Sequence, residues 1–298
     1  QIKSIYLIFV YAISILVYLY FFMTSDNIPI HTSENEYAGM RKAGSLAAQI
    51  LDELKEIIKP GISTKEINDF CERIIKENNA TAAPKNYKIP SIKKPFPESV
   101  CTSVNHVVCH GIPSEKKILQ NADIVNVDIT VILDGWHGDC SRMYTPGRIN
   151  KRIELLLKTT YECLLLGIKN AKPGKHLGDI GYAIQKHAES KKFSVVRDFC
   201  GHGIGKKFHT PPSVLHYGNP DEGIELRPGM FFTIEPMINI GDWRIKNLKE
   251  KDGSNAWPAV TKDRSLSAQF EHTIGITENG NEIFTLSQNN TDFPINTI

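Results

Sequence analysis

Two aspartates, Asp128 and Asp139, lie on either side of an Asp-Gly pair at 134–135, inside an apolar stretch that covers residues 125–144. An Asp-Gly pair between alternating runs predicts a β-hairpin with a two-residue turn. In that register Thr130 faces Asp139, and Asp128 lies two residues along on the same face. The two carboxylates are then diagonal neighbours, within roughly 7–8 Å at the backbone. A four-residue loop preserves this register, whereas a loop with an odd number of residues would not.

Two further acids interrupt apolar, strand-like segments in the second half of the chain: Glu235 in "MFFTIEPM" and Glu271 in "SAQFEHTIGIT". A histidine, His202, is flanked by glycines in "CGHGIG", which permits close backbone approach. Each of these residues alone is more often a solvated acid or a structural histidine. The opposite face of the predicted hairpin is apolar, with Val125, Val127, Ile129 and Val131.

Four carboxylates that share one concavity repel one another strongly unless positive charge compensates them. Two divalent cations would do so. With His202 the donor set is rich in oxygen, which favours Mn, Fe, Co or Zn in a dinuclear site over a thiolate-type structural zinc. Two metals about 3.5–4 Å apart activate water and polarise a carbonyl, so the implied reaction is hydrolysis of an amide or ester. The chain carries no GxSxG elbow, Walker loop or Rossmann GxGxxG motif.

Helical periodicity indicates which elements position these residues. Apolar residues recur at helix spacing over 35–59, and "KPG" at 59–61 ends that pattern. "STKE" at 63–66 is a capping box that opens a second helix to about Asn78. The plan then repeats, because a helix predicted over 151–171 ends in a second "KPG" at 172–174. Aligning the two triplets places Glu66-Ile67 over Asp179-Ile180, each opening the next helix.

Two more repeats follow in the same order. "HGI" occurs at 110–112 and 202–204, and "LQNADIVNVD" at 119–128 aligns without gaps to "LRPGMFFTIE" at 226–235. This alignment superimposes Asp128 on Glu235. We therefore predict one α+β domain made of two symmetric halves, with helices on one face of an antiparallel sheet. The acidic face of the hairpin then lines a concave site.

Composition excludes several function classes. The chain has 298 residues, 23% charged, and a net charge of +2, so no nucleic-acid footprint is visible and no direct nucleic-acid partner is expected. Six scattered cysteines without a CxxC pair favour free thiols in a reducing compartment. The basic, proline-rich segment at 83–99 contains Lys85, Lys88, Lys93 and Lys94, and is interpreted as a solvated loop rather than an anion-binding surface.

The N-terminus is unusual, because no charge occurs between Lys3 and Asp26 and residues 4–23 are long and apolar enough to cross a bilayer. Two interpretations stay open. Residues 1–29 are either a leader with a candidate transmembrane helix or translated sequence upstream of the true start, since the first residue is Gln1. The catalytic domain is predicted to cover 30–298.

Five motifs in order resemble a family. "CTSVNHVVCHGIP", "DIVNVDITVILDGWHGD", "VVRDFCGHGIGKKFH", "GMFFTIEPMIN" and "TKDRSLSAQFEHT" are similar to those of type I, bacterial-type methionine aminopeptidases, and the resemblance extends from about residue 30 to 286. It implies the pita-bread fold, which is an α+β fold with a pseudo-twofold antiparallel sheet, helices on the outer face and a dinuclear metal site on the concave face. The implied activity is hydrolytic removal of the initiator methionine from nascent proteins and peptides, with a preference for a small second residue.

The resemblance also implies roles for individual residues. The metal ligands would be Asp128, Asp139, His202, Glu235 and Glu271. Glu235 would also move the proton of the attacking water, and His110 and His209 would hydrogen-bond the substrate and its developing oxyanion. The methionine side-chain pocket would be formed by Phe96, Cys101, Phe208, Trp257 and Tyr87. Sulfur and aromatic rings pair favourably, which suits a methionine side chain.

Two segments depart from the family pattern: the loop at 87–97 is longer, and "EKDGSNAWPAV" at 250–260 carries extra residues before Trp257. These departures lie next to two of the predicted pocket residues, Tyr87 and Trp257. Type II members insert a helical subdomain between the positions of His202 and Glu235, and the 33-residue step here is too short for one.

Three alternative functions are less consistent with the sequence. A proline-specific relative of the same fold shares the five ligand types but normally carries a large additional N-terminal domain, for which residues 1–34 leave no room. A pita-bread binding protein without catalysis would lack ligands, and none is missing. A membrane-anchored binding module rests on residues 4–23 alone. Because nascent chains emerge at the ribosome, we expect the protein to work in the cytoplasm near the ribosome. We also expect a monomer, in which residues 4–23 are either absent or tether the protein to a membrane.

Overall fold

The structure is a computed structural model that describes residues 27–293. The apolar stretch at 4–23 therefore lies outside the described residues, as does all of the predicted leader except residues 27–29. Among the residues that are described, no helix has the length and apolar character that a membrane span requires.

Two helices and five strands form the first half of the fold. They are α2 (Glu34–Leu54), α3 (Thr64–Glu77), β1 (Thr81–Ala82), β2 (Cys101–Val104), β3 (Val107–Cys109), β4 (Val125–Leu133) and β5 (Trp136–Tyr144). The predicted capping box is confirmed, because the backbone N–H of Ser63 donates to the Glu66 carboxylate at 2.8 Å. Helix α2 ends five residues before the predicted limit, since the N–H groups of Lys55, Glu56 and Ile57 donate to the carbonyls three residues back instead of four.

The second half repeats this plan. It contains α4 (Lys151–Asn170), α5 (Leu177–Ser190), β6 (Ser194–Val195), β7 (Gly201–Gly203), β8 (Thr210–Val214), β9 (Phe231–Ile234), β10 (Met237–Asn239), β11 (Ile245–Lys249), β12 (Asn255–Thr261), β13 (Ser267–Gln269), β14 (His272–Thr277) and β15 (Gly280–Ile283). Asp179 accepts from the His176 N–H at 2.8 Å, as Glu66 does from Ser63. The predicted alignment of the two helix starts is confirmed by this shared cap.

The β4–β5 hairpin has the predicted register. Leu133 pairs with Trp136 and Thr130 pairs with Asp139. Both turn residues, Asp134 and Gly135, have positive φ, as the favoured two-residue hairpin turn requires. This register places Asp128 and Asp139 on one face.

The strands form several short antiparallel sheets instead of the one sheet that the sequence suggested. Their orders are β1-β4-β2 with β5 also on β4, β13-β10-β6, β11-β12-β3, and β15-β14-β9-β7-β8. An antiparallel bridge between Ser141 and Glu271 connects the two halves, with backbone hydrogen bonds in both directions at 3.1 and 3.4 Å. We call the line along this bridge the seam.

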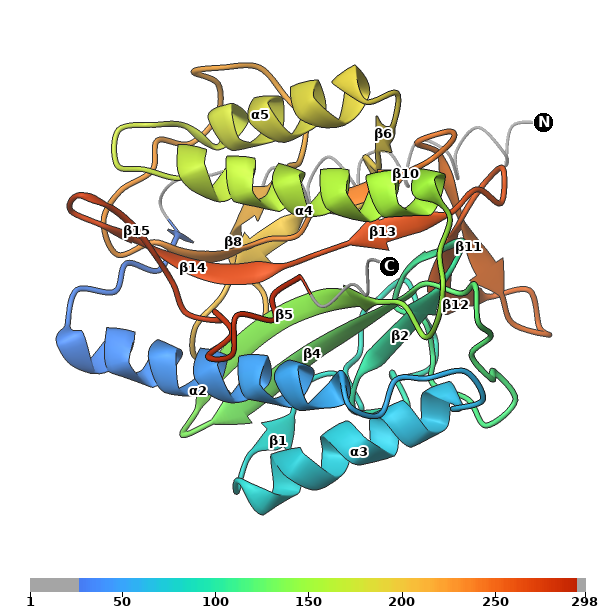
Figure 1. The fold of residues 1–298 in the computed structure, drawn as a ribbon. Coiled ribbons are helices and arrows are strands. Elements are labelled where there is room, and N and C mark those ends of the chain that lie inside the picture. The colour runs from blue at the N-terminus through green and yellow to red at the C-terminus, as the bar shows by residue number, and fades with distance from the viewer. Residues whose placement is uncertain (1–26, 294–298) are drawn as a thin grey trace, which may run out of the picture.

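The helices lie outside the strands in both halves. Figure 1 shows α4 and α5 above the strands and α2 and α3 below them, so the strands form the inner layer. Under α2 and α3, the apolar face of β4 packs with Val125, Val127, Ile129 and Val131 completely buried. A second core joins α4 and α5 to β9 and β14. The polar faces of the strands therefore point away from the helices, towards the seam.

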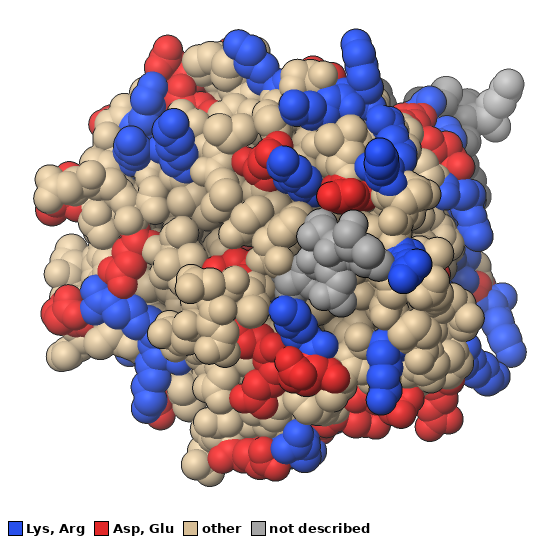
Figure 2. All heavy atoms as spheres, in the orientation of Figure 1, with Lys and Arg blue, Asp and Glu red and all other residues tan. Residues whose placement is uncertain are grey.

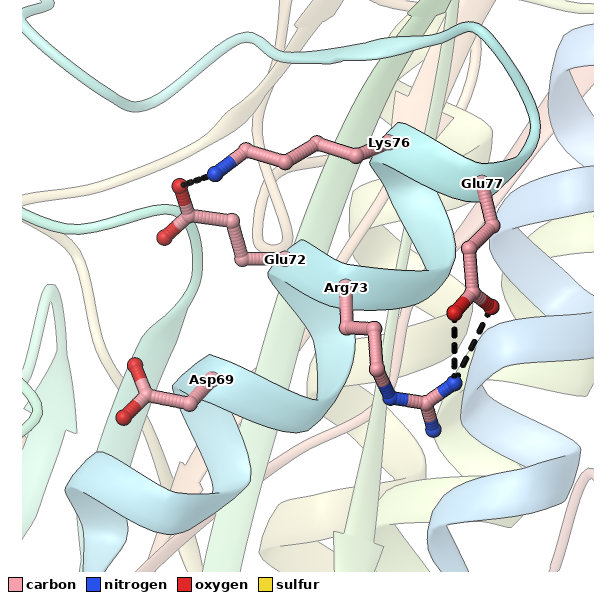
Figure 3. A pocket seen from close by; sticks show the side chains of 5 residues that line it. All are labelled: Asp69, Glu72, Arg73, Lys76 and Glu77. Atoms are coloured by element: carbon pink, nitrogen blue, oxygen red, sulfur yellow. Dashed lines mark hydrogen bonds and ion pairs between the residues drawn. The ribbon is translucent and has the colours of Figure 1, made fainter.

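The outer surface carries charges of both signs. Figure 2 shows Lys and Arg interspersed with Asp and Glu over the face that it displays. A hollow on the outside of α3 is lined by Asp69, Glu72, Arg73, Lys76 and Glu77 (Figure 3). Four of its five charges pair with one another, Lys76 with Glu72 at 2.6 Å and Arg73 with Glu77 at 3.0 Å, and Asp69 pairs with Lys65.

Candidate active site

A row of side chains crosses the seam from one half of the fold to the other. Cys101 of β2 is paired with Asp128 of β4, Asp128 with Ser141 of β5, and Ser141 with Glu271. Residues directly opposite each other in antiparallel strands project from the same face. Asp139, two residues before Ser141, joins that face and is 3% exposed.

The second half contributes His202 from β7 and Glu235, which follows β9. The Nε2 atom of His202 lies 3.5 Å from Oδ2 of Asp139 and 3.8 Å from Oε1 of Glu235. One ligand atom each from Asp139, His202 and Glu271 lie within 4.8 Å of one another. The ladder between β9 and β14 pairs Ile234 with His272. Glu235 and Glu271 occupy the next opposed positions, at the end of that ladder. All five predicted ligands therefore come from the strands that meet at the seam.

Uncharged hydrogen-bond donors orient these carboxylates. The Thr130 hydroxyl donates to Oδ1 of Asp139 at 2.8 Å. The Thr233 hydroxyl donates to Oε1 of Glu235 at 2.8 Å, and Nε2 of Gln269 donates to Oε2 of the same residue at 3.1 Å. Sequence reasoning noticed Thr130 only as the partner of Asp139 and missed Thr233 and Gln269. Their signal was position, since each lies two residues from a predicted ligand.

Burial and mutual repulsion raise the pKa values of three carboxyl groups at the seam. Removal from water, together with the charges of Asp139 and Glu235, raises the pKa of Asp128 well above its usual range. The pKa of Glu271 is raised well above its usual range for the same reasons. Burial also raises the pKa of Glu235, to about 7, although the neighbouring His202 acts in the opposite direction. Burial lowers the pKa of His202, but Asp139 and Glu235 outweigh it and the pKa is raised overall.

This donor set fits divalent cations. Within residues 27–293 the ion pairs of Asp139 and Glu235 involve His202 alone, and no Lys or Arg lies in ion-pair contact with any of the four carboxylates. No Lys or Arg among these residues therefore offsets the repulsion among the four carboxylates, which a bound cation would do. Four carboxylates with one imidazole are ligands that first-row divalent metals accept.

Two further histidines lie near the seam, and burial keeps both neutral. Burial lowers the pKa of His110 to about 4. The pKa of His209 falls to about 2, because burial acts together with His202, His110 and His137. The rings of His202 and His209 are 4.1 Å apart at their centroids. A neutral imidazole retains one N–H group, so each histidine can donate one hydrogen bond.

An apolar cluster lies next to the Asp128 end of the row. Phe96, Cys101 and Trp257 form it together with Ile92, and Tyr87 packs against it. Phe96 meets Trp257 edge-on at 5.4 Å, and Trp257 lies 5.9 Å from the His110 ring. Phe208 is linked to the cluster through Tyr87, at 5.1 Å. The structure thus brings together all five residues predicted to form a side-chain pocket.

The two segments that the resemblance predicts to be longer than usual contact each other. Lys93 pairs with Asp252 at 3.1 Å, and Lys94 pairs with Glu250 at 2.7 Å. Between them, the indole N–H of Trp257 donates to the Lys94 carbonyl at 2.9 Å. We call this set of contacts the latch. It connects the 87–97 loop to the β11–β12 connection at the back of the apolar cluster.

Comparison with known proteins agrees with the class that this fold and site define, a metal-dependent peptidase. Residues 38–278 match the model of metallopeptidase family M24. A methionine aminopeptidase of Rickettsia prowazekii is 52% identical over 267 residues, which are 90% of this chain and 98% of that protein. The chain therefore belongs to metallopeptidase family M24, in its bacterial-type methionine aminopeptidase branch.

Solved structures place the fold in the same branch. A crystal structure of the methionine aminopeptidase from Rickettsia prowazekii superimposes with a TM-score of 0.81 at 53% identity, covering 87% of this chain and all of that one. The enzyme from Thermotoga maritima superimposes with a TM-score of 0.80 at 40% identity, covering 87% and 99%. A prolidase from Pyrococcus horikoshii shares the fold alone, at 21% identity and a TM-score of 0.66. The predicted pita-bread fold and family are confirmed.

Proposed function

We propose that this protein hydrolyses the peptide bond after an N-terminal methionine, in nascent proteins and peptides whose second residue is small. The observation that carries the proposal is the convergence on the seam of the five side chains predicted to be metal ligands, beside an apolar cluster that contains sulfur and aromatic rings. The curated relatives that the chain matches over most of their length are named methionine aminopeptidases, which supports the same reaction.

The family and the donor set support the use of divalent metal, and we propose two ions, of Co, Mn, Fe or Zn. Asp128, Asp139, His202, Glu235 and Glu271 would hold them. When bound, the ions would neutralise the four carboxylates and supply Lewis-acid activation of water and of the scissile carbonyl. The threonine and glutamine hydrogen bonds to Asp139 and Glu235 fix the direction in which these carboxylates point.

The chain's own residues would carry the remaining steps. Glu235 would accept a proton from the attacking water and return it to the leaving amine, since its carboxylate is held on both oxygens at the centre of the seam. His110 and His209 would each donate their single N–H to the substrate, one of them to the oxygen on which negative charge develops. Because both imidazoles are neutral, they would not repel the bound cations.

The apolar cluster would select methionine. Phe96, Cys101, Phe208 and Trp257, with Tyr87, would surround the first side chain with rings and sulfur. A lysine or aspartate side chain there would be buried without a charge partner, at a cost of several kcal/mol.

The proposed substrates determine the proposed location. Initiator methionine is removed from chains that emerge from the ribosome, so we propose a monomer working in the cytoplasm near the ribosome, without direct nucleic-acid binding. The catalytic domain would be 30–298. Residues 1–29 would be either absent from the mature protein or a tether at the cytosolic surface of a membrane. Sequencing the mature N-terminus from fractionated cells distinguishes these cases.

Release of free methionine from short peptides tests the activity. The full chain, first stripped with a chelator and then supplied with one metal at a time, should cleave Met-Ala-Ser but neither Lys-Ala-Ser nor an N-terminally acetylated peptide. A strict requirement for proline at the second position would overturn the proposal in favour of a proline-specific relative. Hydrolysis that survives complete metal removal would overturn the assignment of the seam.

A further inference from the structure

The hydroxyl of Tyr87 contacts the imidazole of His209, across the two halves of the fold. Its Oη atom lies 2.8 Å from Nδ1 of His209, and the two rings are 5.2 Å apart at their centroids. Phe208 packs against both rings, at 5.1 Å from Tyr87 and 4.1 Å from His209. Tyr87 therefore touches a candidate catalytic residue as well as the apolar cluster.

The position of this hydroxyl is determined by a folded loop. The N–H of Tyr87 donates to the Pro84 carbonyl at 2.9 Å. On the other side of the loop, Phe96 donates to the Tyr87 carbonyl at 2.9 Å, and Asn86 donates to the Phe96 carbonyl at 2.8 Å. Phe96 is 2% exposed and packs on Trp257, whose indole is bound by the latch. The Tyr87 backbone is thus anchored to the interior by local and tertiary contacts.

The contact constrains which nitrogen of His209 carries a proton. A neutral imidazole has a single N–H, so the partner of Nδ1 decides which of the two ring nitrogens carries it. If Tyr87 donates its hydroxyl proton to Nδ1, the ring proton must be on Nε2. If instead Nδ1–H donates to the tyrosine oxygen, Nε2 has no proton and cannot donate to a carbonyl oxygen.

We propose that the Tyr87 hydroxyl is a positioning group that holds His209 in the tautomer protonated on Nε2, the nitrogen left to face a substrate. The contact links the tautomer of His209 to the Tyr87 hydroxyl, whereas the choice of Nε2–H rests on the proposed function, in which His209 donates to a substrate oxygen. This role is additional to the ring of Tyr87 forming part of the pocket wall. The hydroxyl and the ring can therefore be separated by mutation.

Tyr87→Phe removes the hydroxyl and retains the ring. Removing one oxyanion donor outright typically lowers kcat about 10²–10³-fold. Losing control of the tautomer should lower kcat by part of that, about 10-fold or more, with KM for Met-Ala-Ser changed by less than about twofold. In a His209→Ala background the same substitution should lower kcat no further, because the two residues act as one unit. Tyr37→Phe removes a hydroxyl that is bonded to the Ile276 carbonyl, and Tyr37 is not among the candidate site residues, so this control should leave kcat unchanged.

A spectroscopic measurement tests the tautomer without relying on turnover. In the full chain with ¹⁵N-labelled histidine, Nδ1 of His209 should show the chemical shift of an unprotonated nitrogen and Nε2 that of a protonated one. Tyr87→Phe should move both resonances towards an average of the two tautomers. If methionine release is absent but these shifts are found, the proposed function fails and the tautomer proposal stands. A wild-type resonance protonated on Nδ1 would overturn the proposal, as would a Tyr87→Phe variant that changes only KM.

Discussion

Replacing Glu235 by glutamine should alter stability in opposite directions with and without divalent metal. Without metal, the Glu235 carboxylate is buried beside other acids, and this raises its pKa from 4.5 to about 7. The group therefore binds its proton more tightly in the folded protein than in the unfolded chain. With metal, the same carboxylate is a ligand, and its loss removes binding free energy from the folded state.

The sign and size follow from linkage. A carboxyl whose pKa is raised on folding contributes stability that is fully present below the unfolded pKa of 4.5, and that is lost as the pH rises through about 7. A shift from 4.5 to about 7 corresponds to roughly 3 kcal/mol, which the wild type loses over this interval and Glu235→Gln does not. For a chain of this size that is roughly 6–12 °C in Tm. The pKa shifts of His110 and His209 do not involve Glu235, so the contribution of these two histidines is common to both proteins and cancels in the difference.

Thermal and urea unfolding of the full chain at several pH values between 4 and 8 would measure this difference. In chelator, the stability of Glu235→Gln relative to wild type should increase by about 3 kcal/mol from pH 4 to pH 8. In excess Mn²⁺ at pH 7 the variant should be the less stable protein. Glu225→Gln, which alters an exposed acid, is the matched control and should show neither effect. A difference that is flat with pH in chelator would refute the electrostatic account of the seam.

Three further outcomes are expected. Asp139→Asn should abolish peptide hydrolysis while leaving the far-ultraviolet circular dichroism spectrum unchanged, and near-normal turnover would contradict its assignment as a ligand. Asp52→Asn should lower the free energy of unfolding by about 3–5 kcal/mol in urea titrations, because Arg142 is 2% exposed and would lose its buried ion-pair partner; a change below 1 kcal/mol would mean that Asp292 compensates. Peptides beginning with Lys should be cleaved at least about 100-fold more slowly than those beginning with Met, which competition between the two substrates measures, since burying an unpaired ammonium costs several kcal/mol.

Local features of the sequence were enough to predict the elements that position the site. The Asp134–Gly135 pair determines the hairpin register through its backbone conformation, and the observed pairing of Thr130 with Asp139 confirms it. The capping box at 63–66 likewise determines where α3 begins. In both cases the hydrogen bonds and backbone conformation involve residues within the motif, so they do not depend on contacts with distant segments.

Contacts between distant segments could not be predicted in the same way. The Ser141–Glu271 bridge, which joins the two halves, depends on how the two cores pack. The contact between Tyr87 and His209 spans 122 residues. The latch joins two segments that the family pattern showed only as longer than usual. In the loop at 83–99, the prediction of solvated lysines was incomplete, because Lys85, Lys93 and Lys94 each pair with an acid of this chain.

The acids of the seam are informative because they conflict with the strands that carry them. An apolar β4 interrupted by Asp128 would be a poor core strand, yet its other face packs four fully buried aliphatic side chains under α2 and α3. That face stabilises the strand whatever the state of the seam. The symmetric core under α4 and α5 does the same for β9 and the chain leading to Glu235. The two cores can therefore hold mutually repelling carboxylates in place until cations bind. Acids that interrupt apolar strands in both halves of the fold, where each core still stabilises its strand, indicate function more strongly than any single motif.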